Sequence, residues 1–368
     1  YTKILWVYVP KLWNIRSWKI LIEQPENQKQ AEGDENSIPL SVADTALPEI
    51  RPPNAGFILQ LFLIPMMIVA VIICVWLLFN FISRGETPTE LVRGLQKMNN
   101  ASWQKAYTLS SLLRAPASEL KNDKELAQEL IAVLETKLTE ETADANQVKL
   151  RIFVCKCLGE FEIDSGLSAL LNAAQQTNNA NDLVIALTAV ESVAVLMSNL
   201  DESVLSENYD RIVETLLAVS NEQAENPDHA LRVNQLRSAA GFALGVAGGD
   251  KAIQRLVSML DDAYPNARFN AAIGLARYGK LESTAVLLEM LDPGNTAITN
   301  GEPEGSHAFK RSVVITNAIR AVVSLSEFHQ TGELSDLIDA MRNLDSSEKV
   351  VSQTKLLAKD AVVKIIKK

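Results

Sequence analysis

Residues 266–293 read NARFNAAIGLARYGKLESTAVLLEMLDP. Apolar side chains recur at helical spacing in the first half of this stretch and again in the second half, and Tyr278–Lys280 form a turn between them. The positions that mark the two apolar faces are Phe269, Ala272, Ile273 and Leu275–Ala276 in the first half, and Ala285, Leu287, Leu288 and Leu291 in the second. The stretch therefore predicts a pair of short helices.

Two other stretches repeat this order of residues. Residues 236–262 read LRSAAGFALGVAGGDKAIQRLVSMLDD, and residues 150–174 read LRIFVCKCLGEFEIDSGLSALLNAA. In all three copies an arginine precedes a Leu-Gly or Leu-Ala pair at the same offset; these arginines are Arg151, Arg237 and Arg268. Less regular helix pairs are predicted around 183–217 and 313–344, and the region 103–138 begins the series. Because one helix pair cannot bury its apolar face alone, the pairs are expected to stack into a continuous core.

The repeated units resemble the HEAT repeat family, including the variant found in phycobilisome-lyase-like HEAT proteins. The likeness rests on the arginine, on the Ala-rich positions and on the Leu-Gly before the turn, and it covers residues 88–368. It implies an all-α fold in which helical hairpins form an α-solenoid. Small residues are expected to let paired helices approach closely; they include Ala239, Ala240, Ala271 and Ala272.

Five residues are candidates for contact with a protein partner. Arg237 and Arg268 are interpreted as residues that cap or bridge adjacent repeats, with direct partner binding as the alternative. The repeat period breaks at residues 292–308, DPGNTAITNGEPEGSHA. An insertion of this length either contacts a partner, through Asn300, Glu304 and His307, or is a tolerated surface loop.

An apolar segment precedes the repeats. Residues 57–81 read FILQLFLIPMMIVAVIICVWLLFNF and contain no charged side chain. At about 1.5 Å per residue such a segment crosses a hydrocarbon core of roughly 30 Å, so it predicts a single transmembrane helix, kinked at Pro65. Arg51 alone lies close on the N-terminal side, whereas Arg84, Arg93 and Lys97 follow on the C-terminal side. This bias favours a cytoplasmic repeat domain.

The segment 1–56 is expected to be partly disordered or interfacial. Residues 1–22 mix tryptophan with basic residues, which suits either a membrane interface or a terminus without fixed structure. Residues 23–56 are polar and proline-containing, and predict a linker. A short N-terminal region, an apolar span and the opening WQKAYTLSSLLR at 103–114 also resemble membrane-anchored HEAT proteins of planctomycete-type bacteria. That resemblance implies the bacterial inner membrane.

Composition argues against several classes of function. A formal net charge of −10 disfavours nucleic acid as a partner, because such binding depends on clustered Lys and Arg. Cys155 and Cys157 are interpreted as small core residues, and Asp261–Asp262 as solvated caps at a turn. Residues 274–280, GLARYGK, lack both the Ser or Thr and the preceding strand of a phosphate-binding loop. We find no nucleophile, base and orienting group together, and expect no enzymatic activity, cofactor or metal.

Three functional hypotheses follow. The leading one is a non-catalytic, membrane-anchored scaffold or adaptor that binds another protein through its repeat surface, near a membrane-associated complex. The alternative is an accessory subunit of a larger inner-membrane complex for transport or energy transduction, with the apolar helix packed against other spans. A chromophore lyase or chaperone is a third hypothesis, implied only by the phycobilisome-lyase-like resemblance.

Overall fold

The computed structural model describes residues 55–83, 87–96, 102–116, 118–138 and 144–368. Every regular element in these ranges is an α-helix or a short 3-10 turn, which confirms the predicted all-α class. The predicted interfacial or disordered segment and linker at residues 1–54 lie outside these described ranges. The α-helices are α1 (Ala55–Ser83), α2 (Pro88–Gln96), α3 (Ser102–Arg114), α4 (Lys124–Leu138), α5 (Ala145–Gly159), α6 (Leu167–Ala174), α7 (Ala180–Asn199), α8 (Glu202–Ser220), α9 (Ala230–Ala247), α10 (Gly249–Met259), α11 (Pro265–Arg277), α12 (Thr284–Leu291), α13 (His307–Leu325), α14 (Ser335–Asn343) and α15 (Ser352–Ile366).

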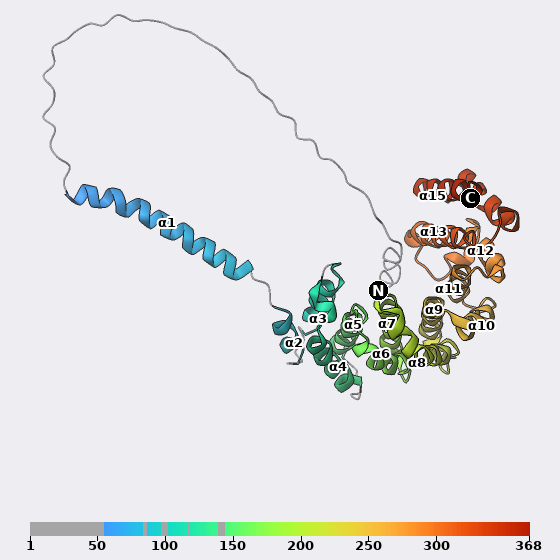
Figure 1. Ribbon diagram of the computed structural model, residues 1–368, viewed down its shortest axis with the longest axis horizontal. Helices are drawn as coiled ribbons and strands as arrows, with labels where there is room; N and C mark the ends of the chain where they lie inside the picture. Colours follow the sequence, from blue (N-terminus) through green and yellow to red (C-terminus); the bar gives the residue numbers. More distant parts are fainter. Residues whose placement is uncertain (1–54, 84–86, 97–101, 117, 139–143) are drawn as a thin grey trace, which may run out of the picture. The chain divides into compact units, whose positions relative to one another are not determined.

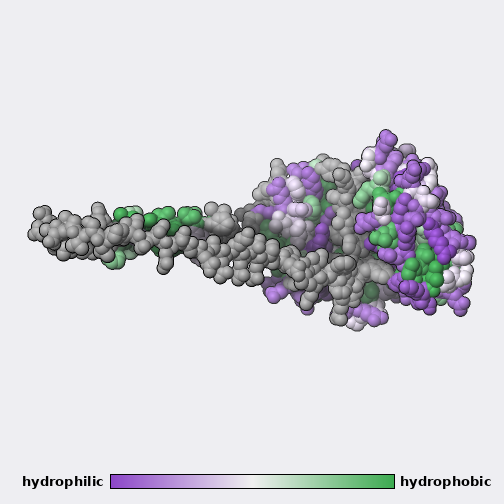
Figure 2. Space-filling view, turned by 90° about the horizontal axis from the view of Figure 1, so that it is seen from above, coloured by the Kyte–Doolittle hydropathy of each residue, from purple (hydrophilic) through white to green (hydrophobic). Residues whose placement is uncertain are grey.

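Helix α1 belongs to one unit and the repeats, Thr87–Lys368, to another. The predicted apolar segment 57–81 forms a helix that extends two residues further at each end. Its 29 residues give a length of about 44 Å. All side chains from Phe62 to Leu78 are exposed and none is charged, and Figure 2 shows hydrophobic residues along this helix. Pro65 lies inside it.

Helix α7 also satisfies a length and hydropathy test for a membrane span, but its environment differs. Most of its apolar stretch is buried inside the repeat unit, where it packs against α5, α6 and α9. An apolar helix enclosed by protein is a core helix. The long apolar helix whose side chains remain exposed is therefore α1.

The repeat unit consists of two rows of helices (Figure 1). One row contains, in chain order, α3, α5, α7, α9, α11, α13 and α15. The other row contains the helices between them, α4, α6, α8, α10, α12 and α14. Neighbours in the first row contact each other more extensively than neighbours in the second. The first row therefore lies on the inner side of the curve that this unit follows, and we call it the inner row.

The core of the repeat unit consists of two clusters of buried hydrophobic residues, and both include residues of α11. Ala271 and Leu275 close a cluster that begins at Leu91. Phe269 and Ala276, on the other side of the same helix, begin the cluster that reaches α15. Helix α11 is therefore a wall shared by both clusters, as expected for stacked repeats.

The turn after α11 shows why the helices end where the sequence predicts. Gly279 has φ +66, a left-handed conformation that glycine adopts readily. The Gly279 N–H donates to the Ala276 carbonyl and the Lys280 N–H to the Leu275 carbonyl, both at 3.1 Å. These two bonds form a Schellman motif, which satisfies carbonyls left free at a helix end. The predicted turn is confirmed, and the GLARYGK sequence is a helix terminus.

One part of the predicted apolar face of α12 is wrong. Ala285 is exposed, whereas Val286 and Met290 are buried. Leu287 and Leu291 are buried, as predicted, so the observed face includes Val286 and Met290 in place of Ala285. The small residues at Ala239, Ala240, Ala271 and Ala272 are buried, as predicted.

Candidate interaction surfaces

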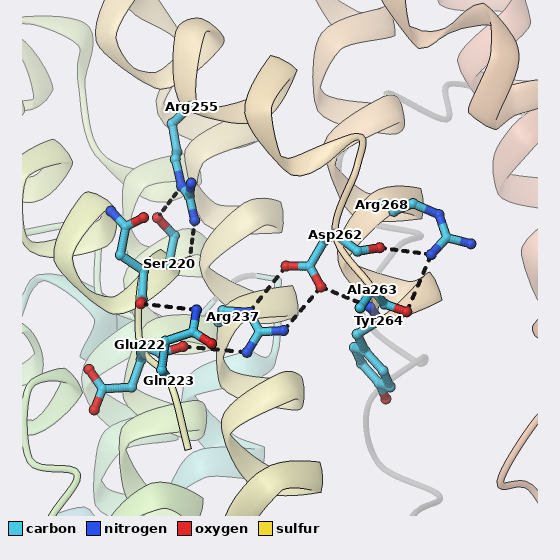
Figure 3. Close-up of polar contacts among 10 residues, drawn as sticks. Ser220, Glu222, Gln223, Arg237, Arg255, Asp262, Ala263, Tyr264 and Arg268 are labelled. Carbon is cyan, nitrogen blue, oxygen red and sulfur yellow. Dashed lines mark hydrogen bonds and ion pairs between the residues drawn. The ribbon is translucent and has the colours of Figure 1, made fainter. Parts of the chain in front are cut away.

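The arginine network, which comprises Ser220, Arg237, Arg255, Asp262 and Arg268, joins successive repeats (Figure 3). Arg237, on α9, donates from Nε to Asp262 Oδ2 at 3.1 Å and from Nη2 to Asp262 Oδ1 at 3.0 Å. Its Nη1 donates to the Glu222 carbonyl, in the turn before α9, at 3.3 Å. Arg237 thus fixes both the far end of its own hairpin and the preceding turn.

Arg268 makes the equivalent contacts one repeat later. It pairs with Glu289 on α12, and its Nη1 donates to the Asp262 carbonyl at 2.8 Å. Asp262 therefore binds Arg237 of its own repeat through its carboxylate and Arg268 of the next repeat through its backbone (Figure 3). Arg255 on α10 adds a hydrogen bond from Nε to Ser220 Oγ at 2.9 Å.

The interpretation of Asp262 as a solvated cap is wrong, because only 10% of its side chain is exposed. Burial raises the pKa of this carboxyl, but hydrogen bonds from Arg237 and the Tyr264 N–H, together with the charges of Arg237 and Arg255, outweigh burial and hold the pKa below its ordinary value. The donors of Arg237 and Arg268 point at oxygens of the same chain. The bridging role is therefore the one that their geometry supports.

The insertion 292–308 is anchored to the repeat unit. It contains two short 3-10 turns, and Ile298, the last residue of the first, is buried in the core. His307 Nε2 lies 2.9 Å from the Glu302 carbonyl, so this ring contacts the insertion's own backbone. Asn300 and Glu304 are exposed. Of the three candidate residues in this insertion, Asn300 and Glu304 are therefore the two that solvent or a partner can reach freely.

A surface on α3 and α5 was not singled out from the sequence. We call it the aromatic–basic surface; it comprises Trp103, Tyr107, Lys149, Phe153 and Lys156. The Trp103 and Phe153 rings are stacked with centroids 6.3 Å apart, and Tyr107 meets Phe153 edge-on at 5.3 Å. The Lys149 Nζ lies 5.0 Å from the Trp103 ring centroid, and the Lys156 Nζ lies 5.3 Å from that of Phe153. These distances are within the range of a cation–π contact.

Acidic groups lie beside this surface. Glu160, which follows the last residue of α5, pairs with Arg114 of α3 at 3.1 Å. Glu191 lies on α7, and burial raises the pKa of its carboxyl to about 7 although the Lys156 charge lowers it. Burial also lowers the pKa of Lys156. The surface therefore combines one exposed ring, Tyr107, with partly exposed rings and lysines, and carboxyl groups lie close to it.

The raised pKa of Glu191 predicts a pH-dependent stability. A carboxyl whose pKa is higher in the folded state stabilises fully below its unfolded pKa, near 4.5, and loses that contribution as pH rises through about 7. Glu191→Gln removes the charge at constant shape. We expect it to raise the free energy of unfolding by about 2 kcal/mol at about pH 8, with no difference below about pH 4. Urea unfolding of the variant and of the unmodified chain at both pH values measures this difference. A variant that is no more stable than the unmodified chain at about pH 8 would contradict the prediction.

Cys155 and Cys157 are completely buried, which confirms their assignment to the core. Burial raises the pKa of the Cys155 thiol to about 12 and also raises that of Cys157. Thiols in this state are poor nucleophiles and poor metal ligands at neutral pH. Their environment therefore favours packing over chemistry.

Hydrophobic residues are also exposed on α15. Leu356, Val363 and Ile366 have 60%, 48% and 48% of their surface accessible. Figure 2 shows hydrophobic residues gathered at the α15 end of the repeat unit, among hydrophilic neighbours. These three side chains are aliphatic, in contrast with the aromatic–basic surface.

Comparison with known proteins bears on the repeats alone. No curated protein is significantly similar to the chain. The family model of HEAT repeats matches residues 232–299, which contain most of α9, the whole of α10 to α12, and the residues of the arginine network other than Ser220. This match supports the description of the chain as a HEAT-repeat protein.

Proposed function

We propose that the chain is a non-catalytic scaffold or adaptor, held at a membrane by α1, that binds another protein through the inner row of its HEAT-like repeats. The observation that carries the membrane part is the exposure of the apolar side chains from Phe62 to Leu78. Soluble monomers rarely leave so large a contiguous apolar surface in contact with water. Lipid supplies an environment in which those side chains are stable, and the helix is long enough to cross it.

Orientation follows from the charges around α1. Arg84, Arg93 and Lys97 follow the helix, and Arg51 precedes it. Positive residues close to a span are retained on the cytoplasmic side. We therefore assign the repeat unit to the cytoplasmic face of a bacterial inner membrane.

The scaffold part is supported by the architecture of the repeats. HEAT repeats generally mediate protein–protein interaction, and stacked helix pairs create extended surfaces suited to that role. Here the inner row joins seven helices along one side. The aromatic–basic surface lies at the α3–α5 end of that row, and aromatic residues are enriched in the energetically dominant parts of protein interfaces.

Membrane anchoring is tested with charged substitutions in α1. The variant Val69→Arg with Ile73→Arg places two arginines one turn apart in the apolar helix. Each arginine at the centre of a span costs about 3 kcal/mol, so the variant is expected in the soluble fraction. The matched control, Val69→Leu with Ile73→Leu, is expected to stay in the pellet after an alkaline carbonate wash. Extraction of the unmodified chain by that wash would refute the anchor.

The scaffold is tested separately. The chain is solubilised gently from native membranes, purified through a C-terminal tag, and its co-eluting proteins are measured by mass spectrometry. A stoichiometric partner that is lost when inner-row charges are reversed is the expected result. A partner that persists when the repeats are deleted, but is lost when residues 57–81 are replaced, would instead support an accessory subunit of a membrane complex.

A further inference from the structure

The aromatic–basic surface is an arranged site, because its groups fix one another. The Phe153 ring contacts both Trp103 and Tyr107, so three rings from two helices form one cluster. Tyr107 is 55% exposed, and Trp103 and Phe153 are partly exposed. Rings held in place before binding lose little conformational entropy when a partner covers them.

The two lysines of the surface are partly exposed. Among the residues that the structure describes, neither Lys149 nor Lys156 lies within ion-pair distance of a carboxylate. Each instead lies over an aromatic ring. An ammonium group over a ring keeps donors for a second, anionic partner.

The surroundings limit what that partner is. Helices α3 and α5, which carry the surface, belong to the inner row of a curved unit (Figure 1), and a curved row suits a narrow polypeptide better than a flat bilayer. The whole chain has a net charge of −10. A nucleic acid brings a phosphate at every nucleotide, and a chain of this net charge repels such a continuous line of negative charge. A peptide can place a few carboxylates against Lys149 and Lys156 and apolar side chains against the rings.

We infer that the aromatic–basic surface binds an acidic peptide segment of the protein partner, one in which Asp or Glu alternates with an aromatic or large aliphatic residue. This inference rests on the scaffold function proposed above and specifies the chemistry of its partner. The carboxylates pair with Lys149 and Lys156, and the apolar side chain covers Trp103, Tyr107 and Phe153.

The test uses the full chain in detergent micelles and a fluorescently labelled peptide in which Asp and Glu alternate with Phe. Fluorescence anisotropy measures the Kd. Tyr107→Ser is expected to weaken binding about tenfold, because exposed aromatic residues of this kind dominate interface energies. Lys149→Glu is expected to weaken binding to a similar extent through charge repulsion, with an effect that decreases at high salt.

Matched controls separate this site from general surface effects. Phe309→Ser removes another exposed aromatic residue, which is 66% accessible, and Lys124→Glu reverses another exposed lysine. Both are expected to leave the Kd within about twofold of the unmodified chain. Far-ultraviolet circular dichroism confirms that every variant is folded. A peptide in which Ser replaces Phe is expected to bind weakly.

Four results would overturn the inference. These are no binding of the acidic peptide, equal effects of the site and control variants, preference for a single-stranded oligonucleotide, and preference for phosphatidylserine vesicles. Failure here is distinct from failure of the scaffold function. If Tyr107→Ser and Lys149→Glu leave the stoichiometric membrane partner bound, the proposed scaffold function is retained, and the partner binds another part of the inner row.

Discussion

Gly245→Val is expected to lower the free energy of unfolding by more than about 3 kcal/mol. A Cβ at Gly245 would lie 2.8 Å from the Gly274 Cα, and a Cβ at Gly274 would lie 2.9 Å from the Gly245 Cα. The backbones of α9 and α11 therefore touch, and no rotamer change makes space for a side chain. The helices must separate, which also disturbs the hydrogen bond from Arg277 Nη1 to the Gly245 carbonyl at 2.7 Å.

Thermal and urea unfolding of the full chain in detergent measure the loss, and hydrogen exchange of α9 and α11 locates it. Gly245→Ala should cost less, about 1–2 kcal/mol, because alanine favours the helix and so offsets part of the clash. Gly305→Ala is the control, since nothing lies within 4 Å of a Cβ at that position. A Gly245→Val protein as stable as the Gly305→Ala protein would show that the two backbones do not need this contact.

The helix pair 266–293 was predictable because its signals are local. The apolar periodicity of α11, Pro265 at its start and the turn at Gly279 each act over a few residues. The buried face of α12 was less predictable, because this helix has eight residues and most of them are apolar, so more than one face fits the pattern. Ala285 was placed on the buried face, which includes Val286 and Met290 instead.

The contacts that build the candidate surfaces were not predictable from spacing. Trp103 and Phe153 meet only because α3 and α5 pack side by side. A local signal did exist, since Trp103 and Tyr107 share a helix face, as do Lys149, Phe153 and Lys156. What was missing was the packing of the two helices that joins these faces. The same holds for Asp262, whose acidic side chain looks like a turn cap until α9 places Arg237 beside it.

The insertion 292–308 illustrates an intermediate case. Its place in the sequence was recognised from the break in the repeat period. Its anchoring was not, because one buried apolar side chain, Ile298, joins it to the core. One apolar residue in a polar stretch gives little periodic signal. Asn300 and Glu304 are consequently held on the surface of an ordered segment.

Arg237→Met is expected to lower the free energy of unfolding by about 3 kcal/mol at neutral pH, because it leaves the buried Asp262 carboxylate without its partner. The side chains of Arg237 and Asp262 are 9% and 10% exposed. The exposed pair of Lys251 and Asp210, at 56% and 77%, is the control. Lys251→Met should cost less than about 1 kcal/mol, because solvent screens that pair.

Acid distinguishes loss of the ion pair from loss of packing. The pKa of Asp262 is lowered in the folded protein, so its contribution is present above the ordinary value of 3.8 and is lost as pH falls through the lowered pKa. The stability difference between the unmodified chain and Arg237→Met should therefore shrink on acidification. A double-mutant cycle with Asp262→Asn isolates the pairing energy. A difference that stays constant from neutral to acidic pH would assign the effect of Arg237 to its packed side chain, and the Arg237–Asp262 ion pair would then contribute little to the joint between repeats.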